Sequence, residues 1–182
     1  MDMKHDHDDH DEFGGLHRDL TRVVDRRRAL LLMGGGLGTV GSTSCTKLPQ
    51  ETAGPYPGDG SNGPNVLNQS GVVRKDITTS FGTMSGSVTG VPLTMRFKML
   101  DIAKGCTPYA GAAMYAWHCD ADGRYSLYSP GATNQNWLRG VQEADADGWV
   151  TFTSIFPGCY DGRWPHVHFE LYPSLAKANV PV

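Results

Sequence analysis

Apolar and polar residues alternate in the middle of the chain with the period of a β-strand. Over residues 91–100 an apolar side chain occupies every second position from Leu93 to Met99, and Thr, Arg and Lys fill the positions between them. Successive side chains of a strand point to opposite faces, so this pattern predicts a strand with one buried face. Residues 112–119 are apolar with aromatic insertions between turn residues, which predicts a fully buried strand.

Two more apolar segments, at residues 149–155 and 166–172, complete the predicted strands. The chain contains 23 glycines and 11 prolines, and this content interrupts it too often for long helices. Residues 51–65 carry Gly, Pro, Asn or Asp at almost every second position and are predicted to form a loop. No helix of ten or more residues is predicted after residue 45. We therefore predict an all-β fold, an antiparallel β-sandwich with long loops and few or no helices.

The first 44 residues differ in composition from the rest. They are polar and charged up to Arg26, Arg27 and Arg28, and the 13 residues that follow, 29–41, carry no charge. That run is too short to span a bilayer, so no stable membrane insertion is expected. Paired arginines before a short, Gly-rich apolar run resemble a twin-arginine export signal. We expect residues 1–44 to be this signal and the protein to be periplasmic or extracellular. The alternative is a disordered N-terminus with adjacent arginines.

The charge balance argues against a nucleic-acid partner. Lys and Arg number 16 against 19 Asp and Glu, which gives a net charge of −3. A protein without a global positive field has no electrostatic attraction for nucleic acid or for an acidic membrane. The sequence does not set the oligomeric state.

Four cysteines, Cys45, Cys106, Cys119 and Cys159, follow the predicted signal. In an oxidising compartment they permit two disulfides in three pairings, and the spacing does not choose among them. The absence of a Cys-x-x-Cys motif argues against a zinc ribbon. Cys45 also follows a Gly-Ser-Thr-Ser run, as in a lipoprotein cleavage site. Lipid anchoring there is the less favoured alternative, because Ser42 stands where a bulky aliphatic residue is needed.

Two histidines, His166 and His168, lie two positions apart in the last predicted strand. This spacing places both imidazoles on one face of the strand, while Val167, Phe169 and Leu171 face the core. Two imidazoles on one face can share a metal ion. The alternative is a pair of surface histidines without a ligand.

Two tyrosines are candidates to join this histidine pair. Tyr160 lies in the loop before the last strand, and Tyr125 follows the buried strand at 112–119 after an Asp/Gly-rich turn. A phenolate beside two imidazoles favours a hard, strongly Lewis-acidic ion such as Fe(III) over zinc. Each tyrosine taken alone is as well explained by packing in the core or at its rim.

The motifs together resemble the intradiol ring-cleavage dioxygenase family. In chain order they are Thr-x-Gly-Pro-Tyr ending at Tyr56, a Trp eight residues before Tyr125, Pro-Gly-x-Tyr ending at Tyr160, and Arg-x-x-His-x-His-Phe beginning at Arg163. The resemblance runs from about residue 51 to residue 174, in the order of the family. It implies an exported enzyme of the stand-alone type, since no helical dimerisation segment precedes the predicted strands.

The resemblance also implies a ligand set and a reaction. A non-haem Fe(III) would be bound by Tyr125, Tyr160, His166 and His168. The family cleaves a catechol-type ring between its two hydroxyl-bearing carbons with O2, giving a cis,cis-muconate-type diacid. Tyr125 would be the phenolate that stays bound, and Tyr160 the one that the substrate displaces.

Three more residues are implied to contact the substrate. Arg163 would lie beside the open face of the metal and stabilise the developing anion, with a surface ion pair as the alternative role. Tyr56 and Trp164 are candidate pocket walls, and packing is the alternative for Trp164. The interval between Tyr160 and His166 is shorter than in aromatic-degrading members of the family, which predicts a more open pocket.

A different class of function competes with the enzyme. The chain ends at Val182, soon after the last predicted ligand, whereas the family usually continues with further strands. We therefore expect a core at 45–182 that is truncated at its C-terminus. This favours the alternative of a non-catalytic extracellular β-sandwich that binds a ligand and retains the motif. A cupin-type metal site is less favoured, because it needs a glutamate further along than Glu170.

Overall fold

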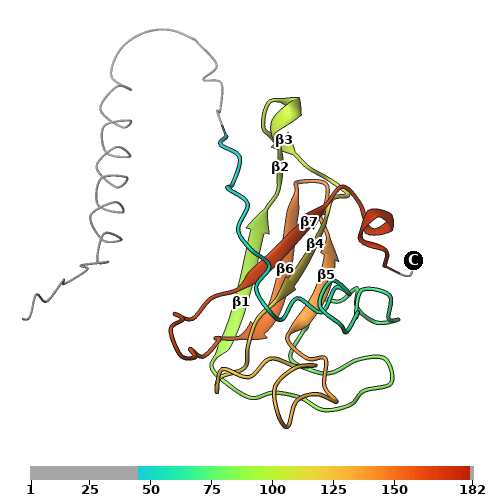
Figure 1. The fold of residues 1–182 in the computed structure, drawn as a ribbon. Helices are drawn as coiled ribbons and strands as arrows, with labels where there is room; N and C mark the ends of the chain where they lie inside the picture. The colour runs from blue at the N-terminus through green and yellow to red at the C-terminus, as the bar shows by residue number, and fades with distance from the viewer. Residues whose placement is uncertain (1–44, 181–182) are drawn as a thin grey trace, which may run out of the picture. The chain divides into compact units, whose positions relative to one another are not determined.

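The computed structural model describes residues 45–180, and the predicted export signal lies outside them. In chain order the elements are β1 (Pro92–Lys98), β2 (Leu100–Asp101), η1 (Ile102–Lys104), β3 (Thr107–Pro108), β4 (Ala113–Trp117), β5 (Arg139–Glu143), β6 (Trp149–Ile155), β7 (His168–Tyr172) and η2 (Leu175–Ala178). Both helices are single 3-10 turns, and long loops join the strands (Figure 1). The all-β prediction is confirmed. No helix of the described part is long and apolar enough to cross a bilayer.

Two antiparallel sheets form the centre of the fold. β1 pairs with β6 from Pro92 opposite Ile155 to Lys98 opposite Trp149. β4 is the middle strand of the order β5-β4-β7. β2 and β3 form a separate small hairpin. The strands predicted at 91–100, 112–119, 149–155 and 166–172 correspond to β1, β4, β6 and β7.

β5 was not predicted, because Arg139-Gly-Val-Gln-Glu143 has neither alternation nor an apolar run. Its first three residues are buried, although no pattern in the sequence predicts this burial. A Cβ on Gly140 would lie 2.6 Å from the Ile77 side chain, so this strand passes too close to a neighbouring loop for any larger residue. The strand forms because each of its residues pairs with a residue of β4 in the antiparallel ladder.

β4 is buried along its whole length because both of its faces are covered. Met114 and Ala116 belong to a cluster shared with Met95 and Phe152 of the β1-β6 sheet. Tyr115 and Trp117, on the opposite face, belong to a second cluster. That second cluster consists of Val66, Leu67, Val72, Phe81, Ala113, Tyr115, Trp117, Cys119, Tyr125, Val141, Ala178 and Val180. Part of the long loop before β1 therefore covers the second face.

Phe169 and Leu171 were predicted to face the core, but both side chains are only partly covered. Both residues pair with β4 residues of the first cluster, and the Phe169 ring lies 6.0 Å from that of Phe97. Nevertheless Phe169 is 39% and Leu171 52% exposed. β7 is the edge of its sheet, so no strand of the described part covers these side chains from the other side. Val167, in contrast, packs against the first cluster as predicted.

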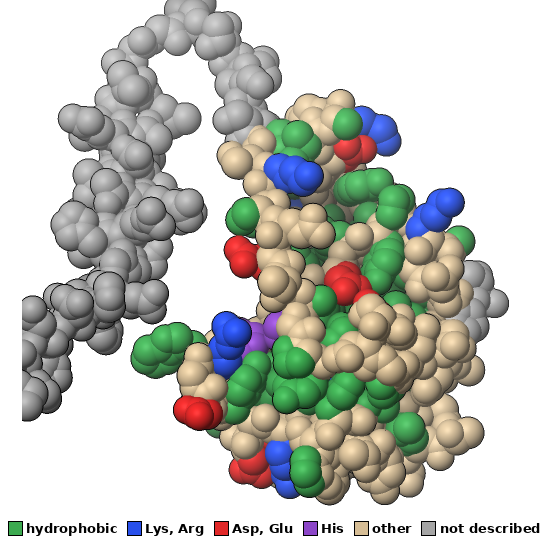
Figure 2. All heavy atoms as spheres, in the orientation of Figure 1, with side chains coloured by type: hydrophobic (Ala, Val, Ile, Leu, Met, Phe, Trp, Pro, Cys, Tyr) green, Lys and Arg blue, Asp and Glu red, His purple; other side chains and the backbone are tan. Residues whose placement is uncertain are grey.

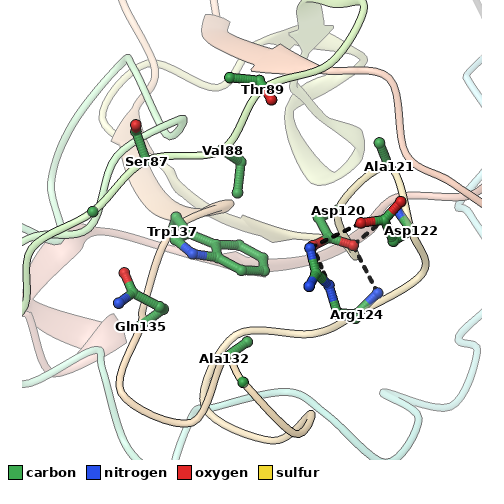
Figure 3. Close-up of a pocket in the computed structure, with 12 residues that line it drawn as sticks. Ser87, Val88, Thr89, Asp120, Ala121, Asp122, Arg124, Ala132, Gln135 and Trp137 are labelled. Atoms are coloured by element: carbon green, nitrogen blue, oxygen red, sulfur yellow. Dashed lines mark hydrogen bonds and ion pairs between the residues drawn. The ribbon is translucent and has the colours of Figure 1, made fainter.

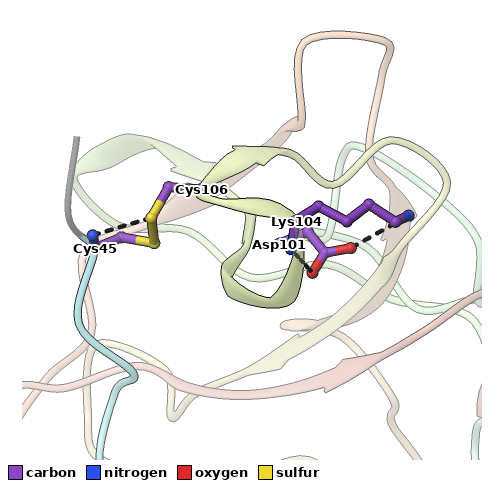
Figure 4. Close-up of a disulfide and its surroundings, with 4 residues drawn as sticks. All are labelled: Cys45, Asp101, Lys104 and Cys106. Carbon is purple, nitrogen blue, oxygen red and sulfur yellow. Dashed lines mark hydrogen bonds and ion pairs between the residues drawn. A yellow bond between two sulfur atoms is a disulfide. The ribbon is translucent and has the colours of Figure 1, made fainter. Parts of the chain in front are cut away.

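One disulfide joins Cys45 to Cys106 and ties the start of the described chain to the β2-β3 hairpin (Figure 4). Cys119, which is buried, and Cys159, which is exposed, are free thiols. Of the bridges possible among these four cysteines, all of which lie in residues 45–180, only this one is formed. A lipid thioether on Cys45 would need the same sulfur, so the disulfide and the lipid anchor exclude each other.

A buried histidine makes stability depend on pH. His118 Nδ1 lies 2.7 Å from the carbonyl oxygen of Cys119, and Nε2 lies 2.7 Å from Ser154 Oγ. Burial lowers the pKa of His118 from 6.5 to about 4. Between these values the unfolded chain binds a proton that the native protein does not. The contribution of His118 to the free energy of unfolding is therefore fully present above pH 6.5, and it is lost as the pH falls towards 4.

We expect the His118 contribution to reach about 3 kcal/mol across this window. Denaturant unfolding of the wild type and of His118→Gln from pH 7 to pH 4 tests it. The variant should start less stable at pH 7 and lose less on acidification. His168 titrates in the same direction in both proteins, so the difference between the two curves isolates His118. Parallel curves would contradict the assignment.

Candidate metal centre

The register between β4 and β7 brings Trp117 and His168 side by side. The two residues pair directly, and their rings stack with centroids 5.0 Å apart and planes 6° from parallel. The pair lies on the face of the sheet that carries the second cluster. The His168 ring there is 6.3 Å from the ring of Tyr125, a member of that cluster.

A carboxylate builds the turn that leads from β4 to Tyr125. Asp120 Oδ1 accepts hydrogen bonds from the backbone N–H groups of Asp122 at 3.0 Å and Arg124 at 2.8 Å, and Oδ2 accepts from Arg124 Nε at 2.8 Å (Figure 3). Such Asx turns hold the chain in one reversed path. The cavity of about 420 Å³ drawn in Figure 3 is lined by this turn and by residues 86–89 and 131–137. None of the four predicted metal ligands lines it.

The four predicted ligands converge at one point. His166 Nε2 lies 3.1 Å from His168 Nε2, 3.3 Å from the Tyr125 hydroxyl and 3.4 Å from the Tyr160 hydroxyl. The two hydroxyls are 3.5 Å apart. These atoms come from three separate segments of the chain, and the structure places all four within reach of one another.

The spacing of these atoms suits a single metal ion that all four donors share. Two donors about 2.1 Å from one ion, at angles between 90° and 110°, are themselves about 3.0–3.4 Å apart. No three His, Cys, Asp or Glu side chains of residues 45–180 gather in a way that could hold a metal. An ion at this point would therefore depend on phenol oxygens as well as imidazoles. This donor set fits a hard, highly charged ion.

The two imidazoles are prepared to act as ligands. His166 Nδ1 lies 2.5 Å from the carbonyl oxygen of Trp164. A carbonyl only accepts, so Nδ1 carries the proton and the Nε2 lone pair faces the cluster. Burial, and then the neighbouring His166, lower the pKa of His168 to about 4. His168 is therefore neutral at pH 7, which is the form that binds metals.

The two phenols differ in their surroundings. Tyr125 is only 1% exposed, whereas Tyr160 lies half-buried in the loop between β6 and β7. Burial, and then a hydrogen bond with Tyr160, raise the pKa of Tyr125 well above its ordinary value. The Tyr125 hydroxyl therefore stays protonated at neutral pH unless a strong Lewis acid takes its proton.

The loop predicted to lie on the substrate side does pack on the cluster. The Tyr56 ring lies 4.7 Å from that of Tyr125 and 5.2 Å from that of Tyr128. Gly54, at φ +71°, comes so close to His168 that a Cβ there would lie 3.3 Å from the imidazole Cε1. A side chain at this position would crowd the imidazole and strain the backbone.

Arg163 and Trp164 lie at the exposed rim of the cluster. Arg163 pairs with Tyr160 in an isolated β-bridge, and it makes no ion pair with any residue of 45–180. The surface ion pair considered for Arg163 is thus not formed. Trp164 is 84% exposed, which overturns packing as its role. His166 and His168 are both partly exposed, so the cluster is open to solvent beside Arg163 and Trp164. Figure 2 shows histidine at the surface next to a basic side chain.

One residue of the site was not predicted. Arg139, the first residue of β5, is fully buried and contacts the segments that carry Tyr56 and Tyr125. An arginine in a segment without apolar periodicity normally lies at the surface, so the sequence carries no signal for this burial.

Comparison with known proteins agrees with this geometry. A family model described as Dioxygenase matches residues 62–176. The solved structure of an intradiol ring-cleavage dioxygenase from Tetranychus urticae is 27% identical, with a TM-score of 0.54, and the match covers 70% of this chain and 59% of that one. The chain belongs to the intradiol ring-cleavage dioxygenase family. The resemblance inferred from the four motifs is therefore confirmed.

Two further relatives of this chain are similar over shorter or looser matches. A chlorocatechol 1,2-dioxygenase from Rhodococcus opacus is 42% identical over 55 residues, which are 30% of this chain and 21% of the relative. The dioxygenase domain of a dioxygenase carbohydrate-binding protein fusion from Streptomyces sp. SirexAA-E is 30% identical. That match covers 68% of this chain and 65% of that one, with a TM-score of 0.49. The chain spans less than two thirds of the length of each of these relatives.

The convergence of four donor atoms predicts a strong dependence of metal binding on each ligand. We expect His166→Ala and Tyr160→Phe to weaken binding of ferric iron by more than about 100-fold, since loss of an outer-sphere partner alone costs 10–100-fold. Iron content after gel filtration measures this effect.

Tyr128→Phe is the matched control. Its hydroxyl contacts Gly58 N and the Asn62 carbonyl rather than the cluster, although its ring belongs to the same aromatic group. Full iron content in both ligand variants would show that these atoms do not form the centre.

Proposed function

We propose that this protein is a ferric intradiol dioxygenase that cleaves a catechol-type ring between its two hydroxyl-bearing carbons with O2. The product is a cis,cis-muconate-type diacid that contains both oxygen atoms. The observation that carries the proposal is the convergence of two phenol oxygens and two imidazole nitrogens, from Tyr125, Tyr160, His166 and His168, at 3.1–3.5 Å. Membership of the family makes an oxidoreductase the expected class of enzyme.

The four residues would hold a non-haem Fe(III). When bound, the ion supplies the Lewis acidity that draws both protons from a catechol and prepares its ring for O2. The fit rests on donor chemistry, since phenolate oxygens stabilise a hard trivalent ion better than a softer divalent one.

The unequal burial of the two tyrosines supports different roles for them. Tyr125 is enclosed by the second cluster and by the Tyr56 ring, so it has no room to leave. Tyr160 lies on the partly exposed loop before β7, where its oxygen, which would be a phenolate while it holds the ion, can move away and accept a proton from the incoming substrate. We assign Tyr125 as the ligand that stays and Tyr160 as the ligand that is displaced.

Arg163 supplies a free positive charge at the open side. It is exposed, and no carboxylate of the described part neutralises it. The β-bridge to Tyr160 keeps its backbone beside the ligand loop. A guanidinium held there stabilises negative charge as it develops on the substrate.

The substrate would bind between Tyr56 on the buried side and Arg163 and Trp164 on the exposed side. Trp164 presents almost its whole indole to solvent, so it offers an aromatic surface to a ring that enters from outside. This arrangement suits a catechol in an open pocket.

The proposal is tested by adding ferric iron to the full chain under air. We expect a broad visible phenolate-to-iron charge-transfer band that shifts with catechol. Oxygen uptake should follow, and the diacid should contain two labelled atoms from ¹⁸O2. A folded, colourless protein that consumes no O2 would instead favour the non-catalytic binding module. A semialdehyde product would contradict cleavage between the hydroxyl-bearing carbons.

Arg163→Gln separates catalysis from metal binding in the same experiment. We expect the variant to keep the charge-transfer band and to lose about 100-fold in kcat, the usual cost of removing one group that stabilises a developing anion. Arg96→Gln is the control, because Arg96 is an exposed arginine over the Trp149 ring on the other sheet. Equal kcat in both variants would exclude a role for Arg163.

We further propose that residues 1–44 direct export to the periplasm or beyond. The Cys45–Cys106 disulfide supports an oxidising destination, because cytosolic proteins rarely keep such bonds. Replacing Arg26 and Arg27 by lysine is expected to leave the protein in the cytoplasm, as judged by cell fractionation in a host with twin-arginine transport. Replacing Arg18 and Arg22 by lysine is the control. Export of both double variants would contradict the signal.

A further inference from the structure

Arg139 is a fully buried cation that has no anionic partner in the described part of the chain. The ion pairs of that part involve Lys104 with Asp101, and Arg124 with Asp120 and Asp122. Arg139 itself is 0% exposed. A charge in such a place is tolerated only if every donor finds a partner.

All five N–H groups of the Arg139 guanidinium are in fact used. Nε donates to Ser126 Oγ at 3.0 Å, and Nη1 donates to the Pro57 carbonyl at 2.8 Å and the Tyr115 hydroxyl at 3.1 Å. Nη2 donates to the carbonyls of Tyr56 and Ser126, each at 3.0 Å. The planar fork of five donors matches its acceptors one for one.

Four of these five acceptors belong to two segments that meet at the candidate metal centre, and the fifth is the Tyr115 hydroxyl of β4. Ser126 follows Tyr125 directly, and both its hydroxyl and its carbonyl are bound by Arg139. The Tyr56 and Pro57 carbonyls belong to the loop whose Tyr56 ring lies 4.7 Å from the Tyr125 ring. A single side chain therefore connects the backbone beside a predicted ligand to the backbone of a predicted substrate wall.

The surroundings leave Arg139 no freedom to move. The Tyr115 hydroxyl, besides accepting from Nη1, donates to the Pro57 carbonyl at 2.7 Å. A Cβ on Gly58 would lie 2.7 Å from Nη1, so the loop approaches the guanidinium as closely as a backbone can. The Ser126 hydroxyl donates to the Trp137 carbonyl at 2.7 Å, which fixes the acceptor that Nε uses.

We infer that Arg139 is a positioning residue that fixes the Tyr125 ring and the Tyr56 wall relative to each other. It contacts neither ring through its hydrogen bonds and acts through the two backbone segments. Lysine cannot replace it, because an ammonium has three donors in a compact group and cannot span five acceptors in one plane. The effect on turnover rests on the proposed function, whereas the effect on ring geometry does not.

A purely structural role is the competing explanation, and Arg74 is the matched control for it. Arg74 is partly buried, and it also donates to carbonyl oxygens, from Nε and Nη2 to Arg139 O and from Nη1 to Thr79 O. Those carbonyls do not belong to the Tyr56 or Tyr125 segments. Two of the three Arg74 bonds hold the Arg139 backbone, which β5 also holds in its ladder with β4. Loss of Arg74 therefore removes comparable bonds but keeps all five acceptors of the Arg139 guanidinium.

The first test uses the full chain without iron and with ¹³C-labelled tyrosine rings. We expect Arg139→Gln and Arg139→Lys to shift the ring signals of Tyr56 and Tyr125, because each ring lies in the other's ring current. Arg74→Gln should lower the thermal midpoint without moving these signals. Ser126→Ala removes one of the five acceptors of Arg139, together with the bond from the Ser126 hydroxyl to the Trp137 carbonyl. It should therefore give a smaller shift of the same signals even if the Arg139 variants do not fold.

The second test uses iron-loaded protein and catechol. Arg139→Lys is expected to displace the charge-transfer band and to lower kcat/KM by about 100-fold, the cost of a misplacement of about 1 Å. The decrease in kcat/KM should come mainly from a higher KM, because Tyr56 forms a wall of the proposed substrate pocket.

The outcomes of the two tests are separable. Unmoved ring signals, with an unchanged band and KM, would overturn the positioning role. A colourless wild type whose ring signals still shift on Arg139→Lys would overturn the proposed function and support the positioning role.

Discussion

The antiparallel register between β4 and β7 decides where the candidate centre lies. It sets Trp117 opposite His168 and sends both side chains to the face of the sheet that the second cluster occupies. A slip of one residue would turn His168 to the opposite face, among the side chains that contact the β1-β6 sheet. Every other donor is then supplied by a loop that packs against this fixed imidazole.

The residue that stacks on this imidazole carries an unsatisfied buried donor. The Trp117 indole Nε1 is buried and has no hydrogen-bond partner in the described part of the chain. An unsatisfied buried donor of this kind costs about 1–3 kcal/mol. The indole nevertheless keeps the orientation that stacks it flat on His168 and against Tyr115. Stacking with these two rings offsets part of this cost.

Much of the fold and most of the site could be predicted from the sequence, because both depend on short-range patterns. Alternation identified β1, a continuous apolar run identified β4, and the His-x-His spacing placed two imidazoles on one face. β5 could not be predicted, since it is stabilised by its neighbours rather than by its own residues. The burial of Arg139 is of the same kind, as its five acceptors lie 13 to 83 positions away in the sequence. The exposure of Phe169 and Leu171 depends on which strand forms the sheet edge, which no local pattern specifies.

The disulfide between Cys45 and Cys106 also isolates the centre mechanically. A pull on the chain before Cys45 is resisted at Cys45 by the sulfur bridge to the β2-β3 hairpin, before it reaches residues 46–53 and the loop with Gly54 and Tyr56. Cleavage at any bond before Cys45 leaves the bridge unaffected. The loop that packs against His168 therefore keeps its conformation when the segment before Cys45 is stretched or removed. Reduction of the bridge would expose the loop to that force.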